Sequence, residues 1–181
     1  MAARKFDPLH LDVAAFAKEG ATLEGRWPIV DLPRLAESAA PRDTLGDVAW
    51  QAHGERREMR GGSAETWLHL RASTRVPLTC QRCLDPVEED LAVEQSLLFV
   101  PGEALAAELD AESEFDVLAI TSALNLRDLI EDELLLVLPL VPRHDECPAP
   151  LPAAAAAQAE EEAERENPFA ALAALRSGKP N

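Results

Sequence analysis

The chain has 181 residues, of which 47% are hydrophobic and 28% charged, and its formal net charge at pH 7 is −16. This length and composition allow one domain with a sizeable core and exclude both a wholly disordered chain and two large domains. The sequence contains no Tyr, three Trp and five Phe, which argues against a protein whose main activity is stacking on exposed bases.

Short elements fill the first part of the chain. An element around Val13–Lys18 comes first, and residues 22–29 then alternate as a strand does. The segment Asp31–Ser38 predicts a short helix with Asp31 as its N-cap. Residues 47–55 again alternate, which predicts a second strand.

A long antiparallel hairpin is the clearest feature of the centre. Residues 66–76 predict a strand in which the side chains of one apolar face alternate with Trp67 and polar side chains on the other. That face consists of Leu68, Leu70, Ala72, Thr74 and Val76. Residues 91–99 repeat the alternation, and the turn CQRCLDP joins the two strands.

The strongest helix is predicted after an acidic, Ala-rich stretch and the short apolar run Phe115–Ile120. Asn125 is its expected N-cap, and Asp128 follows in the capping-box position. Pro139 should end the helix at Leu138. The apolar residues at helical spacing are Leu126, Leu129, Ile130, Leu134, Val137 and Leu138.

These elements predict an α+β fold, with a mostly antiparallel β-sheet or partly closed barrel covered by one strong helix. Residues 1–147 would form this single domain. Residues 148–166, rich in Pro, Ala and Glu, predict a flexible acidic linker. Residues 167–181 predict a short C-terminal helix that docks on the same domain or on a partner. Its expected N-terminus and apolar stripe are Asn167, Pro168, Phe169, Leu172 and Leu175.

No catalytic motif is present. The sequence lacks GxGxxG, GxxxxGK[ST], GxSxG and HExxH, and its four histidines form no i, i+4 pair. We therefore expect no catalytic residues, no organic cofactor and no enzymatic activity.

The three cysteines admit three interpretations. Cys80 and Cys83 form a CxxC, and His144 and Cys147 form an HxxC, which together supply a Cys₃His set suited to tetrahedral zinc. Small side chains that merely close a turn explain the CxxC as well. A redox pair is disfavoured, because such pairs sit at helix N-termini and this CxxC lies in a hairpin that continues through Pro86.

The compartment and the kind of partner follow from composition. The chain shows no signal peptide and no apolar run that could span a bilayer, so we expect a cytoplasmic protein without membrane contact. Residues 1–90 hold 12 Lys and Arg against 15 Asp and Glu, and residues 91–181 hold 5 against 18. The strongly acidic second half favours basic partners over free nucleic acid, although a need for solubility alone also explains its negative charge.

Three blocks in this order resemble the YceD family of large ribosomal RNA subunit accumulation proteins. They are LTCQRCLDPVEEDL, LRDLIEDELLLVLPLVPRHDEC and NPFAALAALR. The resemblance implies a role in the synthesis, processing or stability of large-subunit (23S) rRNA, and hence in ribosome biogenesis. It implies no enzymatic activity and assigns no metal.

Two modes of action remain open. The acidic charge favours an assembly factor that acts through ribosomal proteins or other large-subunit assembly factors. The alternative is direct RNA binding by arginines of the first half, for which a solvated protein surface is the simpler explanation. These arginines are Arg56, Arg57, Arg60, Arg71, Arg75 and Arg82.

Overall fold

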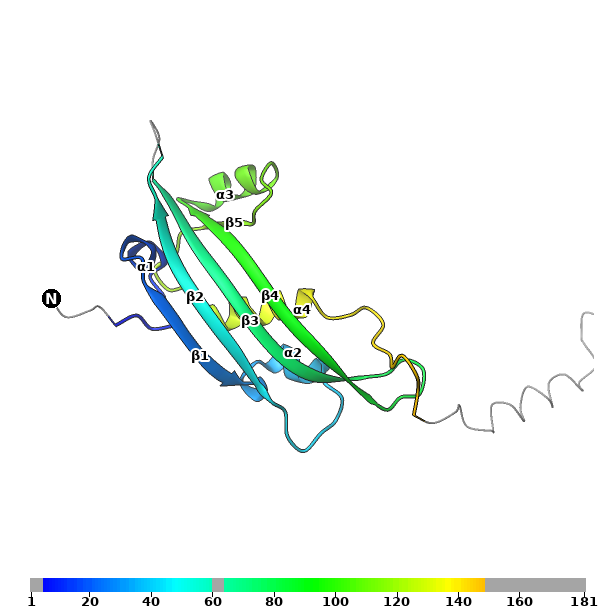
Figure 1. Cartoon of the computed structure of the whole chain (residues 1–181). Helices are drawn as coiled ribbons and strands as arrows, with labels where there is room; N and C mark the ends of the chain where they lie inside the picture. Colours follow the sequence, from blue (N-terminus) through cyan, green and yellow to red (C-terminus); the bar gives the residue numbers. More distant parts are fainter. Residues whose placement is uncertain (1–4, 60–63, 149–181) are drawn as a thin grey trace, which may run out of the picture.

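The computed structural model describes residues 5–59 and 64–148, which form one five-stranded sheet with helices packed behind it (Figure 1). The strands follow one another across the sheet in chain order. Each neighbouring pair is antiparallel except β4 and β5, which run parallel. The strands are β1 (Thr22–Pro28), β2 (Asp47–Arg57), β3 (Glu65–Thr79), β4 (Pro86–Val100) and β5 (Val117–Ala119).

The predicted α+β class is confirmed, but the partly closed barrel is wrong. A barrel requires its first and last strands to hydrogen-bond. Among the described residues β1 pairs only with β2, and β5 has three residues that pair only with β4. The sheet is therefore open.

The strong covering helix, the short helix predicted within Asp31–Ser38 and the element predicted around Val13–Lys18 are all present as helices, and a further helix was not predicted. The described residues contain four α-helices and one 3₁₀ turn. They are α1 (Val13–Lys18), η1 (Ile29–Asp31), α2 (Pro33–Ser38), α3 (Glu103–Asp110) and α4 (Leu126–Leu136). The helix that was missed is α3, which has eight residues with few large apolar side chains, so its apolar periodicity is too short to stand out in the sequence.

The predicted inward face of β3 is confirmed, because the five alternating side chains from Leu68 to Val76 are buried. Trp67 is the exception on the other face, where exposure was predicted: its exposed fraction is 5%. The Phe115 ring packs edge-on against the Trp67 ring with centroids 5.2 Å apart. The Trp67 Nε1 donates to the Glu65 carboxylate at 2.8 Å. A contact from a distant segment thus buries a position that alternation assigns to solvent.

Helix α4 begins as predicted. The Asn125 side chain accepts hydrogen bonds from the backbone N–H groups of Arg127 and Asp128. The helix ends at Leu136, two residues before the predicted end at Leu138. The Leu138 N–H bonds to the carbonyl of Leu135, which tightens the last turn, and the following proline disfavours helical geometry at this residue.

The N-cap predicted for α2 is wrong. Asp31 ends η1, and Leu32 occupies the cap position without a side-chain hydrogen bond. The carboxylate of Glu131 in α4 takes over this role, since Oε1 accepts from the backbone N–H groups of Arg34 at 2.7 Å and Leu35 at 3.1 Å. Its Oε2 accepts from the Arg34 guanidinium at 2.8 and 3.0 Å. This buried carboxylate therefore fastens α2 to α4.

The predicted linker and C-terminal segment fall almost entirely outside the described residues. Apart from residue 148, the predicted linker 148–166 and the C-terminal segment 167–181 lie outside the described residues. Within the described ranges, no helix combines the length and apolar composition needed to cross a membrane.

Candidate metal centre

The CxxC lies in the turn of the β3–β4 hairpin, as predicted. Strand β3 ends at Thr79 and β4 begins at Pro86. The turn is closed by two backbone hydrogen bonds, from Cys80 N–H to the Asp85 carbonyl at 3.0 Å and from Leu84 N–H to the Cys80 carbonyl at 2.9 Å. No helix starts here, so the dipole that activates a redox CxxC is missing.

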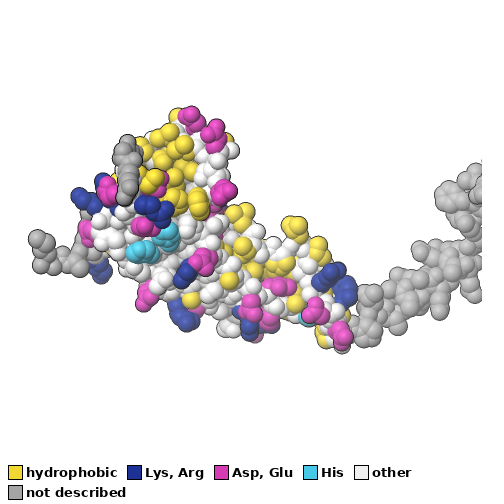
Figure 2. Space-filling model, turned by 45° about the horizontal axis from the view of Figure 1, so that its top comes forward, with side chains coloured by type: hydrophobic (Ala, Val, Ile, Leu, Met, Phe, Trp, Pro, Cys, Tyr) yellow, Lys and Arg dark blue, Asp and Glu magenta, His cyan; other side chains and the backbone are white. Residues whose placement is uncertain are grey.

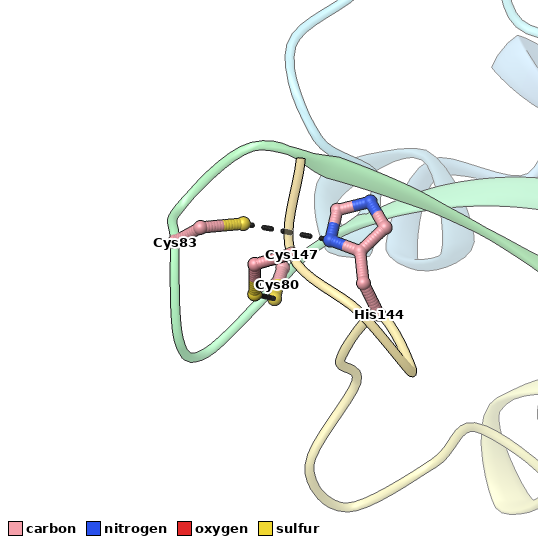
Figure 3. A group of neighbouring side chains, drawn as sticks. All are labelled: Cys80, Cys83, His144 and Cys147. Atoms are coloured by element: carbon pink, nitrogen blue, oxygen red, sulfur yellow. Dashed lines mark hydrogen bonds between the residues drawn. The ribbon is translucent and has the colours of Figure 1, made fainter. Parts of the chain in front are cut away.

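The segment after α4 returns to this turn and brings the HxxC with it. The N–H of Gln81 donates to the Pro142 carbonyl at 2.9 Å, which joins the two segments through their backbones. The four ligand atoms lie within 4.8 Å of one another (Figure 3). They belong to the four residues singled out in the sequence, Cys80, Cys83, His144 and Cys147.

The spacing of these atoms fits a tetrahedral zinc site. With Zn–S bonds of about 2.3 Å and Zn–N bonds of about 2.1 Å, neighbouring ligand atoms stand roughly 3.5–3.8 Å apart. The sulfurs of Cys80 and Cys147 are 4.0 Å apart, and the Cys83 sulfur lies 3.4 Å from His144 Nδ1. These two distances lie within a few tenths of an ångström of the tetrahedral values, and all other pairs of ligand atoms lie within 4.8 Å.

His144 is oriented as a metal ligand requires. Its Nε2 lies 3.1 Å from the Pro86 carbonyl, which can only accept, so Nε2 carries the proton. The lone pair of Nδ1 then points toward the sulfur cluster (Figure 3). A backbone carbonyl that fixes the tautomer of a ligating histidine is a common feature of metal sites.

Arg82 is the residue of this centre that sequence reasoning assigned elsewhere, to RNA binding. Its Nε donates to the Cys147 sulfur at 3.2 Å, and Nη2 donates to the carbonyls of His144 at 2.8 Å and Asp145 at 3.2 Å. Three thiolates and one Zn²⁺ carry a net charge of −1, which a guanidinium at this distance offsets. The position of Arg82 between Cys80 and Cys83 was the sequence signal that could have placed it at this centre.

The thiol pKa values reflect the same geometry. The backbone N–H of Cys83, with those of Arg82 and His144, lowers the pKa of Cys80 to about 5, which favours its thiolate form. Loss of hydration raises the pKa of Cys83 to about 11, and the neighbouring sulfurs of Cys80 and Cys147 act in the same direction. A bound cation would deprotonate the remaining thiols.

Leu84, next to the CxxC, adopts a backbone conformation that suits glycine. Its φ is +66° and its side chain is 73% exposed. We expect Leu84→Gly to raise the free energy of unfolding by about 0.5–1 kcal/mol, because it removes a Cβ clash and sacrifices little packing. Urea denaturation measures the change. Leu84→Ala is the control, because it keeps the Cβ; an equal or larger gain with Ala would contradict the explanation.

The described arginines proposed for RNA binding are already bonded within the protein. Arg71 pairs with Glu94 and Arg75 with Asp90 across the β3–β4 ladder. The remaining two pairs are Arg56 with Glu58 and Arg57 with Glu55. Arg60 lies outside the described residues. The four described arginines proposed for RNA binding that lie outside the metal centre are therefore each paired with a carboxylate.

Comparison with known proteins agrees with the resemblance noted in the sequence. No solved structure matches the chain. A family model described as large ribosomal RNA subunit accumulation protein YceD matches residues 68–176, which include the hairpin turn and the segment after α4. The chain belongs to the YceD family of large ribosomal RNA subunit accumulation proteins.

Proposed function

We propose that the protein is a non-enzymatic ribosome biogenesis factor that supports the synthesis, processing or stability of large-subunit rRNA through protein partners. The observation that carries the proposal is the match to the large ribosomal RNA subunit accumulation family over residues 68–176. The acidic second half and the neutralised arginines support a protein-mediated mode. The partners would be ribosomal proteins or other assembly factors of the large subunit.

The metal centre has a structural role in this proposal. Catalytic zinc sites usually have three protein ligands and leave one position open for water or substrate. Here Cys80, Cys83, His144 and Cys147 provide four ligand atoms, enough to fill a tetrahedron. Zinc would fasten the hairpin turn to the segment that follows α4 and would leave no open coordination position.

Direct RNA binding is less well supported by the surface charge. A phosphate group approaching Arg71 or Arg75 must compete with the carboxylates of Glu94 or Asp90, both held in the same strand pair. Repulsion from the surrounding acidic side chains adds to this competition. We therefore favour contact with basic proteins.

Two measurements on the full chain test the proposal. Affinity capture from growing cells is expected to recover large-subunit ribosomal proteins or assembly factors together with precursor rRNA. The purified protein is expected to show no saturable binding to free large-subunit rRNA fragments at low salt, because its net charge of −16 repels the phosphate backbone. Binding is measured by fluorescence anisotropy over a salt series.

Three results would contradict the proposal. Saturable binding that weakens steeply with salt, and that Arg71→Ala together with Arg75→Ala abolishes, would replace the protein-mediated mode by direct RNA binding. A capture that contains no component of the large subunit would overturn the proposed function. Cleavage or modification of precursor rRNA by the pure protein would overturn the non-enzymatic assignment.

A further inference from the structure

Helix α3 carries an apolar surface that no described segment covers. Leu105 and Leu109, one helical turn apart, are 39% and 37% exposed, and the nearby Phe115 is 49% exposed. We call these three side chains the α3 surface. Figure 2 shows hydrophobic side chains gathered at this end of the molecule, with Asp and Glu side chains along the edge.

The α3 surface is held in a fixed position. Ala106, which lies between Leu105 and Leu109 in the helix, is buried, and the backbone N–H of Val117 donates to the Asp110 carboxylate at 2.8 Å, which fixes the segment after the helix. Phe115 packs edge-on against the buried ring of Trp67. A surface built in advance loses little conformational entropy when a partner binds.

Uncompensated negative charge surrounds these apolar side chains. Between Cys83 and Leu126 the sequence contains no Lys, Arg or His. Six acidic residues of segment 103–116 are exposed, and none of them forms an ion pair with the described residues. They are Glu103, Glu108, Asp110, Glu112, Glu114 and Asp116. The carboxylates on the sheet differ, since Asp90 and Glu94 are paired with arginines.

Exposed apolar side chains beside unpaired carboxylates favour a binding partner that is both apolar and basic. We propose that the α3 surface binds a basic segment of another protein, with Lys or Arg flanking two or three large apolar side chains. Apolar contact supplies affinity, and the unpaired carboxylates supply attraction and orientation. RNA is excluded by repulsion. The chain's own apolar segment 167–175 is disfavoured, because five glutamates and one arginine between residues 160 and 166 precede it.

The inference rests on the proposed function only for the identity of the partner, and its experiment can fail separately. A photoreactive benzoylphenylalanine replaces Leu109 in the full-length protein in cells, and the same residue replaces Leu136 as a control, which is 79% exposed on α4. Cross-linked peptides are sequenced by mass spectrometry. The expected product at position 109 is a peptide of another protein with Lys or Arg beside apolar residues, and it is absent at position 136.

The cross-linked peptide is then synthesised and its affinity measured by fluorescence anisotropy. Leu105→Ser with Leu109→Ser is expected to weaken binding at least tenfold, and Glu108→Lys with Glu112→Lys is expected to do the same. The matched controls change exposed residues elsewhere and should leave the affinity within twofold. They are Leu136→Ser with Leu140→Ser, and Glu37→Lys with Asp43→Lys. Circular dichroism verifies that each variant is folded.

Several results would overturn the inference. They are a cross-link to residues 167–176, to a second copy of the chain or to RNA, and equal weakening by the control pairs. A basic peptide from a protein unrelated to ribosomes would uphold the α3 surface and contradict the proposed function. Capture of large-subunit components without any cross-link at position 109 would uphold the function and reject the surface.

Discussion

Replacing Cys83 with serine is expected to lower the zinc content of the purified protein from about one equivalent to below about a tenth of an equivalent. The substitution removes one of four candidate thiolate and imidazole ligands, so water would have to fill the fourth position; the lost sulfur lies 3.4 Å from His144 Nδ1. Metal analysis of protein purified without chelator measures the loss. Glu146→Gln, in the same segment but outside the ligand set, should retain zinc.

The same substitution should destabilise the hairpin turn more than the rest of the domain. Most of the core lies between the sheet and the helices, whereas the centre, at the edge of the core where Cys80 is buried, fastens the turn to residues 142–147. Loss of zinc should remove hydrogen-exchange protection from the Gln81 amide, which bonds to Pro142. The free energy of unfolding should fall by up to about 4 kcal/mol when free zinc is roughly a thousandfold above its Kd. Wild-type protein that contains no zinc and shows no thiol protection would refute the metal centre.

Replacing Glu131 with alanine is expected to cost about 3 kcal/mol of the free energy of unfolding. The Glu131 side chain is 4% exposed, and its removal leaves the backbone N–H groups of Arg34 and Leu35 without their acceptor. Buried donors that lose a charged acceptor cannot recover the energy from water. Urea denaturation followed by circular dichroism measures the change.

Asp132→Asn is the matched control for this prediction. Asp132 pairs with the same guanidinium, that of Arg34, but its side chain is 53% exposed, so its loss should cost less than about 1 kcal/mol. Glu131→Gln should fall between the two, because it keeps an acceptor and removes the charge. Equal costs for Glu131→Ala and Asp132→Asn would show that the buried backbone contacts contribute little.

Local sequence patterns predicted the parts of the fold that depend on neighbours in the chain. The alternation in β3, the hairpin turn and the Asn125 cap each involve residues close in sequence. Features that depend on distant residues were missed. Glu131 caps α2 from 97 residues away, and Phe115 buries Trp67 from another segment.

The candidate site was likewise predicted only in part. Spacing picked out the four candidate ligand residues that the structure brings together, because the CxxC and the HxxC each place two candidate ligands within one turn. Spacing could not show that the Pro86 carbonyl orients His144 or that Arg82 contacts Cys147. Those contacts arise where two segments about 60 residues apart meet, which no local pattern encodes.

The β3–β4 hairpin also sets a length scale for the molecule. Each strand has 15 residues, which at about 3.3 Å per residue makes the hairpin roughly 50 Å long. The turn with the four ligand residues lies at one end, and α3 follows the other end of β4 (Figure 1). The hairpin therefore keeps its two ends apart, so that a component bound at α3 and one that contacts the turn with the four candidate ligand residues would not compete for space.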